Sequence, residues 1–152
     1  MRLLEADPEV MRFTPSRVPQ SEEQTRGRLA GQIARTDALT PFGIWLAEST
    51  DKAFVGWFML VPAGDAQLEL GFMIERSAAG KGFATEVGRA LVAFAFSDPS
   101  ITALTARTDE DNEPSQRVLV KLGFRYVDTV SAPDKVLGRE VRTKRYELAR
   151  NP

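Results

Sequence analysis

The chain has 152 residues, a net charge of −1, 43% hydrophobic residues and 27% charged residues. These values are typical of one globular domain, so residues 1–152 are treated as a single domain. The near-zero charge gives no reason to expect nucleic acid or an anionic membrane as a partner. Cysteine and histidine are absent, which excludes disulfides, a thiolate nucleophile and a histidine base, and no bound metal is expected. No long apolar span or signal-peptide pattern is visible, and a cytoplasmic location is the default expectation.

The first part of the chain combines an irregular segment with one helix. Residues 1–19 contain three prolines and are interpreted as irregular. Ser21 and Gln24 have the spacing of a capping box, which predicts a helix that begins at Ser21. The tryptophans that follow, Trp45 and Trp57, are interpreted as core or sheet-face residues rather than ligand contacts.

The rest of the chain alternates between strand and helix patterns. Apolar and polar residues alternate over three strand-like segments, with turn residues between them. A helix pattern, another strand, a second helix and a final hairpin follow. The strands are predicted at 42–48, 53–61, 67–75, 101–108, 124–129 and 140–148, the turns at 49–52 and 62–65, and the helices at 85–96 and 115–122. A strand–helix–strand unit of this length makes the strands that begin at 67 and 101 parallel neighbours.

A glycine loop lies between the third strand and the helix that follows it. Gly80 and Gly82 stand directly before the helix. Glycines let the backbone approach a ligand closely, and the start of a helix adds unpaired N–H groups and a positive dipole end. This layout predicts a phosphate-binding loop, although two glycines before a helix also occur in simple tight connections. The spacing matches neither the Walker pattern nor GxGxxG, because Thr85 stands three residues after Gly82.

The loop resembles the pyrophosphate loop of the GNAT superfamily of N-acetyltransferases, whose signature is Gln/Arg-x-x-Gly-x-Gly/Ala. Gly80 and Gly82 match, whereas the Gln/Arg position falls on Ser77, with Arg76 one place away. Residues 80–86 are most similar to the Gly-Lys-Gly-Tyr-Ala-Thr-Glu of the branch that includes ribosomal-protein N-terminal acetyltransferases. A second motif resembles the same branch, because residues 112–124 match Asn-x-x-Ser-x-Arg-x-x-x-Lys-x-Gly-Phe at every named position.

The resemblance implies an α/β domain with the acyl-CoA N-acyltransferase fold, in which helices flank a central twisted mixed sheet. Residues 7–13 resemble a segment that follows the family's first strand and most of its first helix, so those two elements are expected to be missing here. Whether the chain is shortened or begins late stays open. Without the first strand, the strand at 42–48 is expected to be an uncovered edge. Self-association, as in a homodimer, or a mobile N-terminal region would follow.

The resemblance also implies acetyl-CoA as cosubstrate, held where two parallel strands splay apart. Its pantetheine arm would pair with the backbone of residues 70–74, and its pyrophosphate would bind the N–H groups of residues 79–85, with Lys81 adding charge. The cofactor-binding residues so implied are Phe72, Met73, Ile74, Ala79, Gly80, Lys81, Gly82, Phe83, Ala84, Thr85, Asn112, Ser115, Arg117 and Lys121.

The implied reaction is direct attack of a primary amine on the acetyl thioester. Glu69 stands where related enzymes use a carboxylate base, directly or through water, and its alternative role is a solvated charge at a strand end. The family often protonates the leaving thiolate with a Tyr at the position of Leu119. Ser115 is the substitute by resemblance, with a helix-capping hydroxyl as its alternative role, and Tyr126 is a weaker candidate.

Two other classes of protein remain open at this stage. The chain could be a non-catalytic acyl-CoA-binding module, because the acid position is altered, or a generic phosphate-binding interaction domain. If it is an enzyme, the acceptor could be a protein N-terminus or a small-molecule amine such as an amino acid, a polyamine or an antibiotic. The loops that form an acceptor pocket carry no readable signature.

Overall fold

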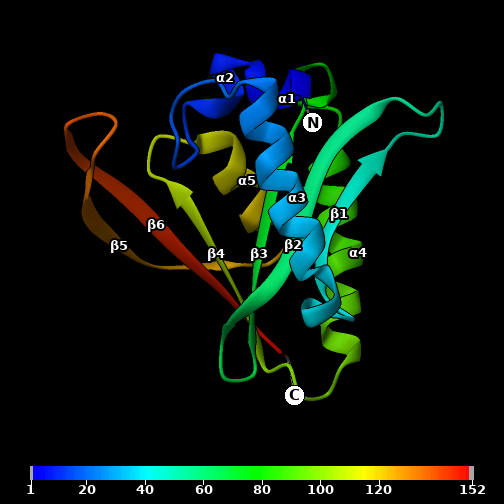
Figure 1. The fold of residues 1–152 in the computed structure, drawn as a ribbon. Helices are drawn as coiled ribbons and strands as arrows, with labels where there is room; N and C mark the ends of the chain where they lie inside the picture. Colours follow the sequence, from blue (N-terminus) through cyan, green and yellow to red (C-terminus); the bar gives the residue numbers. More distant parts are fainter. Residues whose placement is uncertain (1, 151–152) are drawn as a thin grey trace.

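A single mixed sheet of six strands forms the centre of the molecule, in the order β1-β2-β3-β4-β6-β5 (Figure 1). The computed structural model describes residues 2–150, except for the side chains of residues 2, 3 and 35–37. The elements are α1 (Arg2–Ala6), α2 (Pro8–Met11), α3 (Glu22–Leu39), β1 (Gly43–Glu48), β2 (Phe54–Gly64), β3 (Gln67–Ile74), the 3-10 turn η1 (Arg76–Ala78), α4 (Phe83–Ser97), β4 (Ala103–Asp109), α5 (Glu113–Lys121), β5 (Arg125–Asp134) and β6 (Arg139–Ala149).

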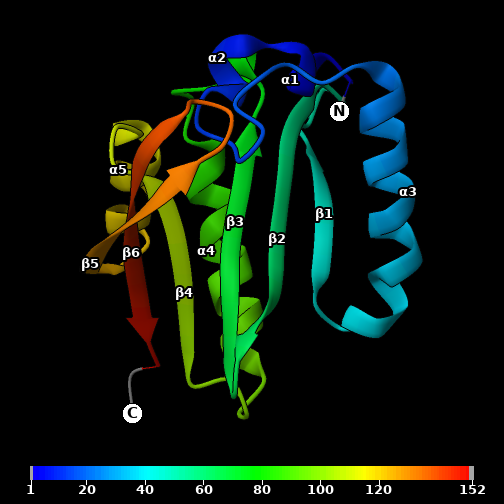
Figure 2. The ribbon, with the colours of Figure 1, turned by 60° about the vertical axis from the view of Figure 1, so that its left-hand side comes forward.

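The parallel pair at the centre of the sheet is short. β3 and β4 pair in parallel only from Gln67 with Ala103 to Glu69 with Thr105, whereas every other neighbouring pair is antiparallel. Beyond Glu69 the two strands diverge toward the end of the molecule where α2 and α5 lie (Figure 2). The predicted mixed sheet and the predicted parallel pair are therefore confirmed, and the divergence opens a gap in the middle of the sheet.

The hydrophobic core lies between one face of the sheet and helices α4 and α5. Leu60, Leu70 and Leu104 project from the strands into it and are at most 1% exposed. Gly88 of α4 lies against Leu122 at the end of α5, where a Cβ would come within 2.7 Å of a Leu122 methyl group. This close approach fixes the two helices next to each other, so that the start of each helix borders the gap between β3 and β4.

The N-terminal segment is more ordered than its prolines suggested. The expectation of an irregular segment over 1–19 is wrong, because α1 and α2 form there. The Asp7 side chain caps α2 by accepting from the Glu9 N–H, and Pro8 occupies the first turn, where its missing N–H costs nothing. The capping box of α3 is confirmed: Ser21 and Gln24 exchange hydrogen bonds of 3.2 and 2.8 Å.

Two strand ends lie further along the chain than predicted. The predicted turn at 62–65 is wrong, since β2 continues to Gly64 and the turn falls at Asp65 and Ala66. A register shift between Pro62 and Gly64 accommodates the proline, which has no N–H to donate. β5 likewise continues to Asp134, because an edge strand tolerates Pro133.

β1 is an edge of the sheet, as expected, and among the described residues no strand precedes it. Its Leu46 side chain is 61% exposed. Helix α3 lies beside β1 on the face of the sheet opposite α4 (Figures 1 and 2). None of the described helices is long and apolar enough to cross a bilayer. Self-association through this edge stays a prediction.

Candidate active site

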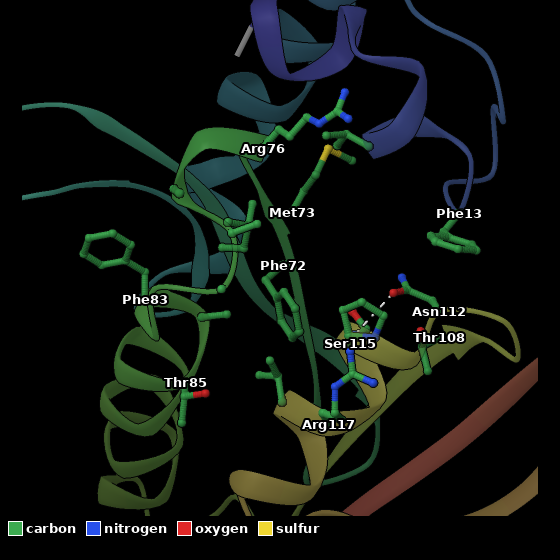
Figure 3. Close-up of a pocket in the computed structure, with 18 of the residues that line it drawn as sticks. Phe13, Phe72, Met73, Arg76, Phe83, Thr85, Thr108, Asn112, Ser115 and Arg117 are labelled. Carbon is green, nitrogen blue, oxygen red and sulfur yellow. Dashed lines mark hydrogen bonds between the residues drawn. The ribbon is translucent and has the colours of Figure 1, made fainter.

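The gap between β3 and β4 forms a cleft of about 620 Å³. One wall is the end of β3, residues 72–74, which lies beyond the part of the strand that pairs with β4. The opposite wall comes from the end of β4 and the first turns of α5, and the loop before α4 closes one end. Phe72 and Met73 face Asn112, Ser115 and Arg117 across this space in Figure 3. An exposed strand edge inside a cleft can pair with an extended, amide-containing ligand.

The glycine loop supplies a row of unused backbone donors. Gly80 and Gly82 adopt φ values of +76° and +91°, and a Cβ at either position would meet no atom within 4 Å. None of the described residues accepts a hydrogen bond from the N–H groups of residues 80–84, whereas the N–H groups of Ala79 and Thr85 bond to Arg76 and Gly82. Gly82 is also the N-cap of the 15-residue helix α4. Unpaired N–H groups at a helix start favour an anion.

The α5 side of the cleft is built by a side-chain cap. The Asn112 Oδ1 accepts from the Ser115 N–H at 3.3 Å, and Pro114 lies in the first turn. Asn112 is therefore the N-cap, as predicted. The Ser115 hydroxyl makes no hydrogen bond to any described residue, and Ser115 lines the cleft. Helix capping therefore does not explain the Ser115 hydroxyl.

The cleft carries an excess of positive charge. Arg12, Arg76, Arg107, Arg117 and Lys121 line it, against the carboxylates of Glu9 and Asp109. Most of these side chains are exposed. They therefore create a positive electrostatic potential at the entrance of the cleft rather than a fixed binding point for one anionic group.

The cofactor-binding residues predicted from the sequence line this cleft, with one exception. Phe72, Met73, Ile74, Ala79, Gly80, Gly82, Phe83, Ala84, Thr85, Asn112, Ser115, Arg117 and Lys121 are all present in its walls. Lys81 is absent from the lining. The ring of Phe83 points away from the other labelled side chains, so its backbone is the part that faces the cleft (Figure 3).

Sequence reasoning missed the contribution of the N-terminal segment. Glu9, Val10, Arg12, Phe13 and Thr14 line the cleft, and Figure 3 shows Phe13 on the side of Asn112 and Thr108. The Asp-Pro-Glu start of α2 was a readable helix signal, but nothing local indicated that this segment would cover the end of the sheet.

A second cleft of about 1000 Å³ lies on the α3 face of the sheet and meets the first one. The two share Phe13, Thr14, Phe72, Met73, Arg107, Thr108 and Asp109. Glu69 lines only the second cleft, at the point where β3 and β4 part. Both of its carboxylate oxygens accept from the Arg107 guanidinium, at 3.2 and 2.7 Å. Glu69 is 17% exposed and Arg107 61% exposed, so solvent reaches this pair.

The structure places the four aromatic or apolar residues that the sequence analysis discussed, namely Trp45, Trp57, Leu119 and Tyr126. The interpretation as core or sheet-face residues holds for both tryptophans: Trp45 packs on Phe94, and Trp57 of β2 lies on the face of the sheet that borders the second cleft. The Trp57 indole N–H is buried without a partner among the described residues. Leu119 is buried in the core and offers no proton donor. Tyr126 lines neither cleft and pairs with the Thr129 hydroxyl, which removes it as a candidate acid.

No group of three or more Asp or Glu side chains suited to a metal ion occurs in the described part of the chain. The groups that the two clefts offer include backbone N–H donors, a strand edge, the Ser115 hydroxyl and the Glu69 carboxylate.

Residues 1–125 match the model of the acetyltransferase (GNAT) domain family. The chain is 26% identical over 135 residues to the FsC-acetyl coenzyme A-N(2)-transacetylase of Aspergillus fumigatus, covering 83% of this chain and 57% of the relative. It is 30% identical over 95 residues to the uncharacterized N-acetyltransferase YjdG of Bacillus subtilis, covering 60% of this chain and 56% of the relative. The chain thus spans little more than half the length of these two relatives.

The fold is shared with solved acetyltransferase structures. A GNAT acetyltransferase from Bacillus anthracis superposes with a TM-score of 0.85 at 20% identity, covering 98% of this chain and 86% of that one. The spermidine N-acetyltransferase of Vibrio cholerae, in complex with CoA and spermine, gives 0.79 at 16% identity, with 96% and 85% covered. A family match over most of the chain, on a sheet that splays beside a glycine loop, shows that this chain belongs to the GNAT family of acetyltransferases.

Proposed function

We propose that this chain is an N-acetyltransferase that transfers the acetyl group of acetyl-CoA to a primary amine by direct attack. One observation carries the proposal: the free edge of β3 leads to five unused N–H groups at the start of α4. That arrangement suits a ligand with an amide-containing arm and a pyrophosphate, which are the two parts of coenzyme A.

The residues of the first cleft fit acetyl-CoA. Backbone groups of residues 70–74 would pair with the pantetheine arm, and the N–H groups of residues 80–84 would bind the pyrophosphate. Arg76 is better placed than Lys81 to add charge there, because Arg76 lines the cleft and Lys81 does not. When bound, acetyl-CoA supplies an activated acetyl thioester.

The amine would approach from the second cleft, since the two clefts meet at Phe72 and Met73. Glu69 faces that cleft at the point where the strands part, and it would take the amine proton, directly or through water. The Ser115 hydroxyl lies on the opposite side, is free of any capping role, and would donate to the leaving thiolate. The amine and the thioester would thus be held between a proton acceptor and a proton donor.

A non-catalytic acyl-CoA-binding module is the second candidate, and the burial of Leu119 at the family's usual tyrosine position favours it. Both candidates bind the cofactor, so binding alone does not separate them. Release of CoA in the presence of an amine does.

The identity of the acetyl acceptor is part of this proposal. Spermidine and phosphinothricin are named for structural neighbours that share the fold at 16% and 17% identity. We propose a small-molecule amine or a protein N-terminus. A homodimer and a cytoplasmic location stay predictions.

The test combines cofactor binding with turnover. Acetyl-CoA is expected to raise the melting temperature, because a ligand of the native state stabilises it by mass action. ADP serves as the control for a generic phosphate-binding domain. Incubation with a panel of polyamines, amino acids, phosphinothricin and peptides, followed by mass spectrometry of the products, then separates an enzyme from a binding module. No shift at millimolar acetyl-CoA would overturn the proposal.

A further inference from the structure

We propose that Arg17 is a positioning residue that holds together the outer wall of the second cleft. It joins three segments distant in sequence: the loop of residues 12–17, the end of β4 and the β5–β6 hairpin. The inference rests on the proposed function in one respect, namely that the amine uses this cleft.

The Arg17 side chain bonds to all three segments. Its Nε donates to the Asp134 Oδ2 at 2.9 Å, and its Nη1 donates to the Asp109 Oδ2 at 2.7 Å and to the Arg12 carbonyl at 2.8 Å. Asp109 ends β4 and Asp134 ends β5. The Arg17 side chain is only 9% exposed, and the two carboxylates are 9% and 12% exposed. We call this cluster of Arg17, Asp109 and Asp134 the latch.

Every carboxylate oxygen of the latch already accepts a hydrogen bond from another group of the protein. The Asp109 Oδ1 accepts from the Asp111 N–H at 3.0 Å. The Asp134 Oδ1 accepts from the N–H groups of Val136 and Leu137 at 2.8 and 3.0 Å. Each carboxylate therefore uses one oxygen to order its own turn and the other to hold Arg17. This pattern indicates a structural clamp rather than a binding site for an ammonium group.

The latch is also the hydrogen-bonded link between the loop and the hairpin among the described residues. In the described part of the chain, the latch contains every hydrogen bond between residues 12–17 and the hairpin. The other bonds of the loop are local, such as those from the Thr14 and Arg17 N–H groups to carbonyls three residues earlier. Phe13 and Thr14 on the loop, and Ala132 and Val136 on the hairpin, all line the second cleft. Release of the latch would free both sides of the wall.

The backbone at Arg17 supports the same inference. Its φ of +59° lies in the left-handed region, which a residue with a Cβ adopts only at a cost. Such a conformation persists where the surrounding contacts require it, and it is typical of functional sites. Burial lowers the pKa of Arg17, but hydrogen bonds and charges from Asp109 and Asp134 outweigh it and leave the pKa raised. The guanidinium therefore stays charged and bonded.

The test uses the full chain and the two tryptophans. In a Trp45→Phe background, Trp57 is the sole tryptophan and reports on the second cleft. Arg17→Lys keeps the charge but cannot donate from two fixed nitrogens to two carboxylates. Arg17→Gly removes the side chain and also relieves the backbone. Arg26→Ala is the matched control, because it breaks only an exposed pair with Glu22 on α3.

We expect acrylamide to quench Trp57 about twofold more strongly in both Arg17 variants, because local opening of the wall exposes the indole. Amide hydrogen exchange is expected to accelerate about tenfold or more in residues 12–17 and 132–138, with the core strands unchanged. Arg17→Lys should retain part of the protection of these amides against hydrogen exchange, and Arg26→Ala should retain all of it. Unchanged quenching, or faster exchange confined to residues 12–17, would overturn the inference. Uniformly faster exchange would show that Arg17 is merely a stability residue and would equally overturn it.

A kinetic readout connects the latch to the amine, with spermidine as the probe. Arg17→Lys is expected to raise the KM for spermidine about tenfold while the KM for acetyl-CoA stays within about twofold. Equal changes in both KM values would contradict a role confined to the second cleft. If the parent protein does not acetylate spermidine, the proposed function fails for this amine, and quenching and exchange still decide whether the latch holds the wall.

Discussion

Ser115 and Asn112 provide the sharpest test of the chemistry, because the structure assigns them different tasks at the start of α5. The Asn112 side chain accepts from the Ser115 N–H, whereas the Ser115 hydroxyl has no partner among the described residues and lines the first cleft. Ser115→Ala therefore removes a group from the cleft and leaves the cap intact. Asn112→Ala removes the cap itself.

The expected stabilities follow from this difference. Loss of an N-cap costs about 1 kcal/mol, and in a domain of this size that lowers the Tm by about 2–4 °C. We expect this result for Asn112→Ala. Ser115→Ala should stay within about 0.5 kcal/mol of the parent, as for a residue outside such features.

Ser115→Ala is expected to lower the activity strongly although it leaves the stability almost unchanged. If its hydroxyl donates to the leaving thiolate, Ser115→Ala removes an interaction made only in the transition state. Both kcat and kcat/KM should then fall together, by about 10- to 100-fold, or about 1.4–2.7 kcal/mol. Ser115→Thr keeps the hydroxyl and should retain most of the activity.

The assay is the release of free CoA thiol at saturating acetyl-CoA, with the acetyl-CoA melting shift measured for each variant. A kcat of Ser115→Ala within about twofold of the parent would refute the donor role. A Tm loss equal to that of Asn112→Ala would instead show that the hydroxyl supports the helix.

Three further predictions follow from other parts of the site. Gly82→Val should abolish the rise in melting temperature with acetyl-CoA, because the valine side chain would occupy the open space over the loop where the pyrophosphate is proposed to bind. Gly82 has a φ of +91°, so backbone strain needs a control, which is Gly138→Val at a φ of +63° in a hairpin turn. Glu69→Gln should lower kcat by about 100-fold with the melting shift retained if Glu69 is the base; an unchanged kcat would leave it as the partner of Arg107 only. Trp57→Phe removes a buried N–H without a partner among the described residues, so denaturant unfolding should show unchanged stability or a gain of up to about 1 kcal/mol; a clear loss would show that the packing of the larger indole ring outweighs the relief of its N–H.

The sequence by itself determined the features that depend on neighbours along the chain. The capping box at Ser21 and Gln24, the Asn112 cap and the glycine loop all involve residues within a few positions of one another. The alternation of the strands and the length of the β3–α4–β4 connection also predicted the parallel pair. Local hydrogen bonding and side-chain periodicity are sufficient for these conclusions.

Only the tertiary structure decided what forms the second cleft and which N-terminal residues border the first one. Arg17 bonds to residues 92 and 117 positions away, and Glu69 pairs with Arg107 across the opening of the sheet. Arg17 lies in a segment that the sequence indicated to be irregular, because contacts of this range leave no periodic trace in the chain. Such contacts exist only after β3 and β4 have diverged and the N-terminal segment has packed over the resulting gap. The sequence therefore predicted the glycine loop, whereas the second cleft became visible only in the folded molecule.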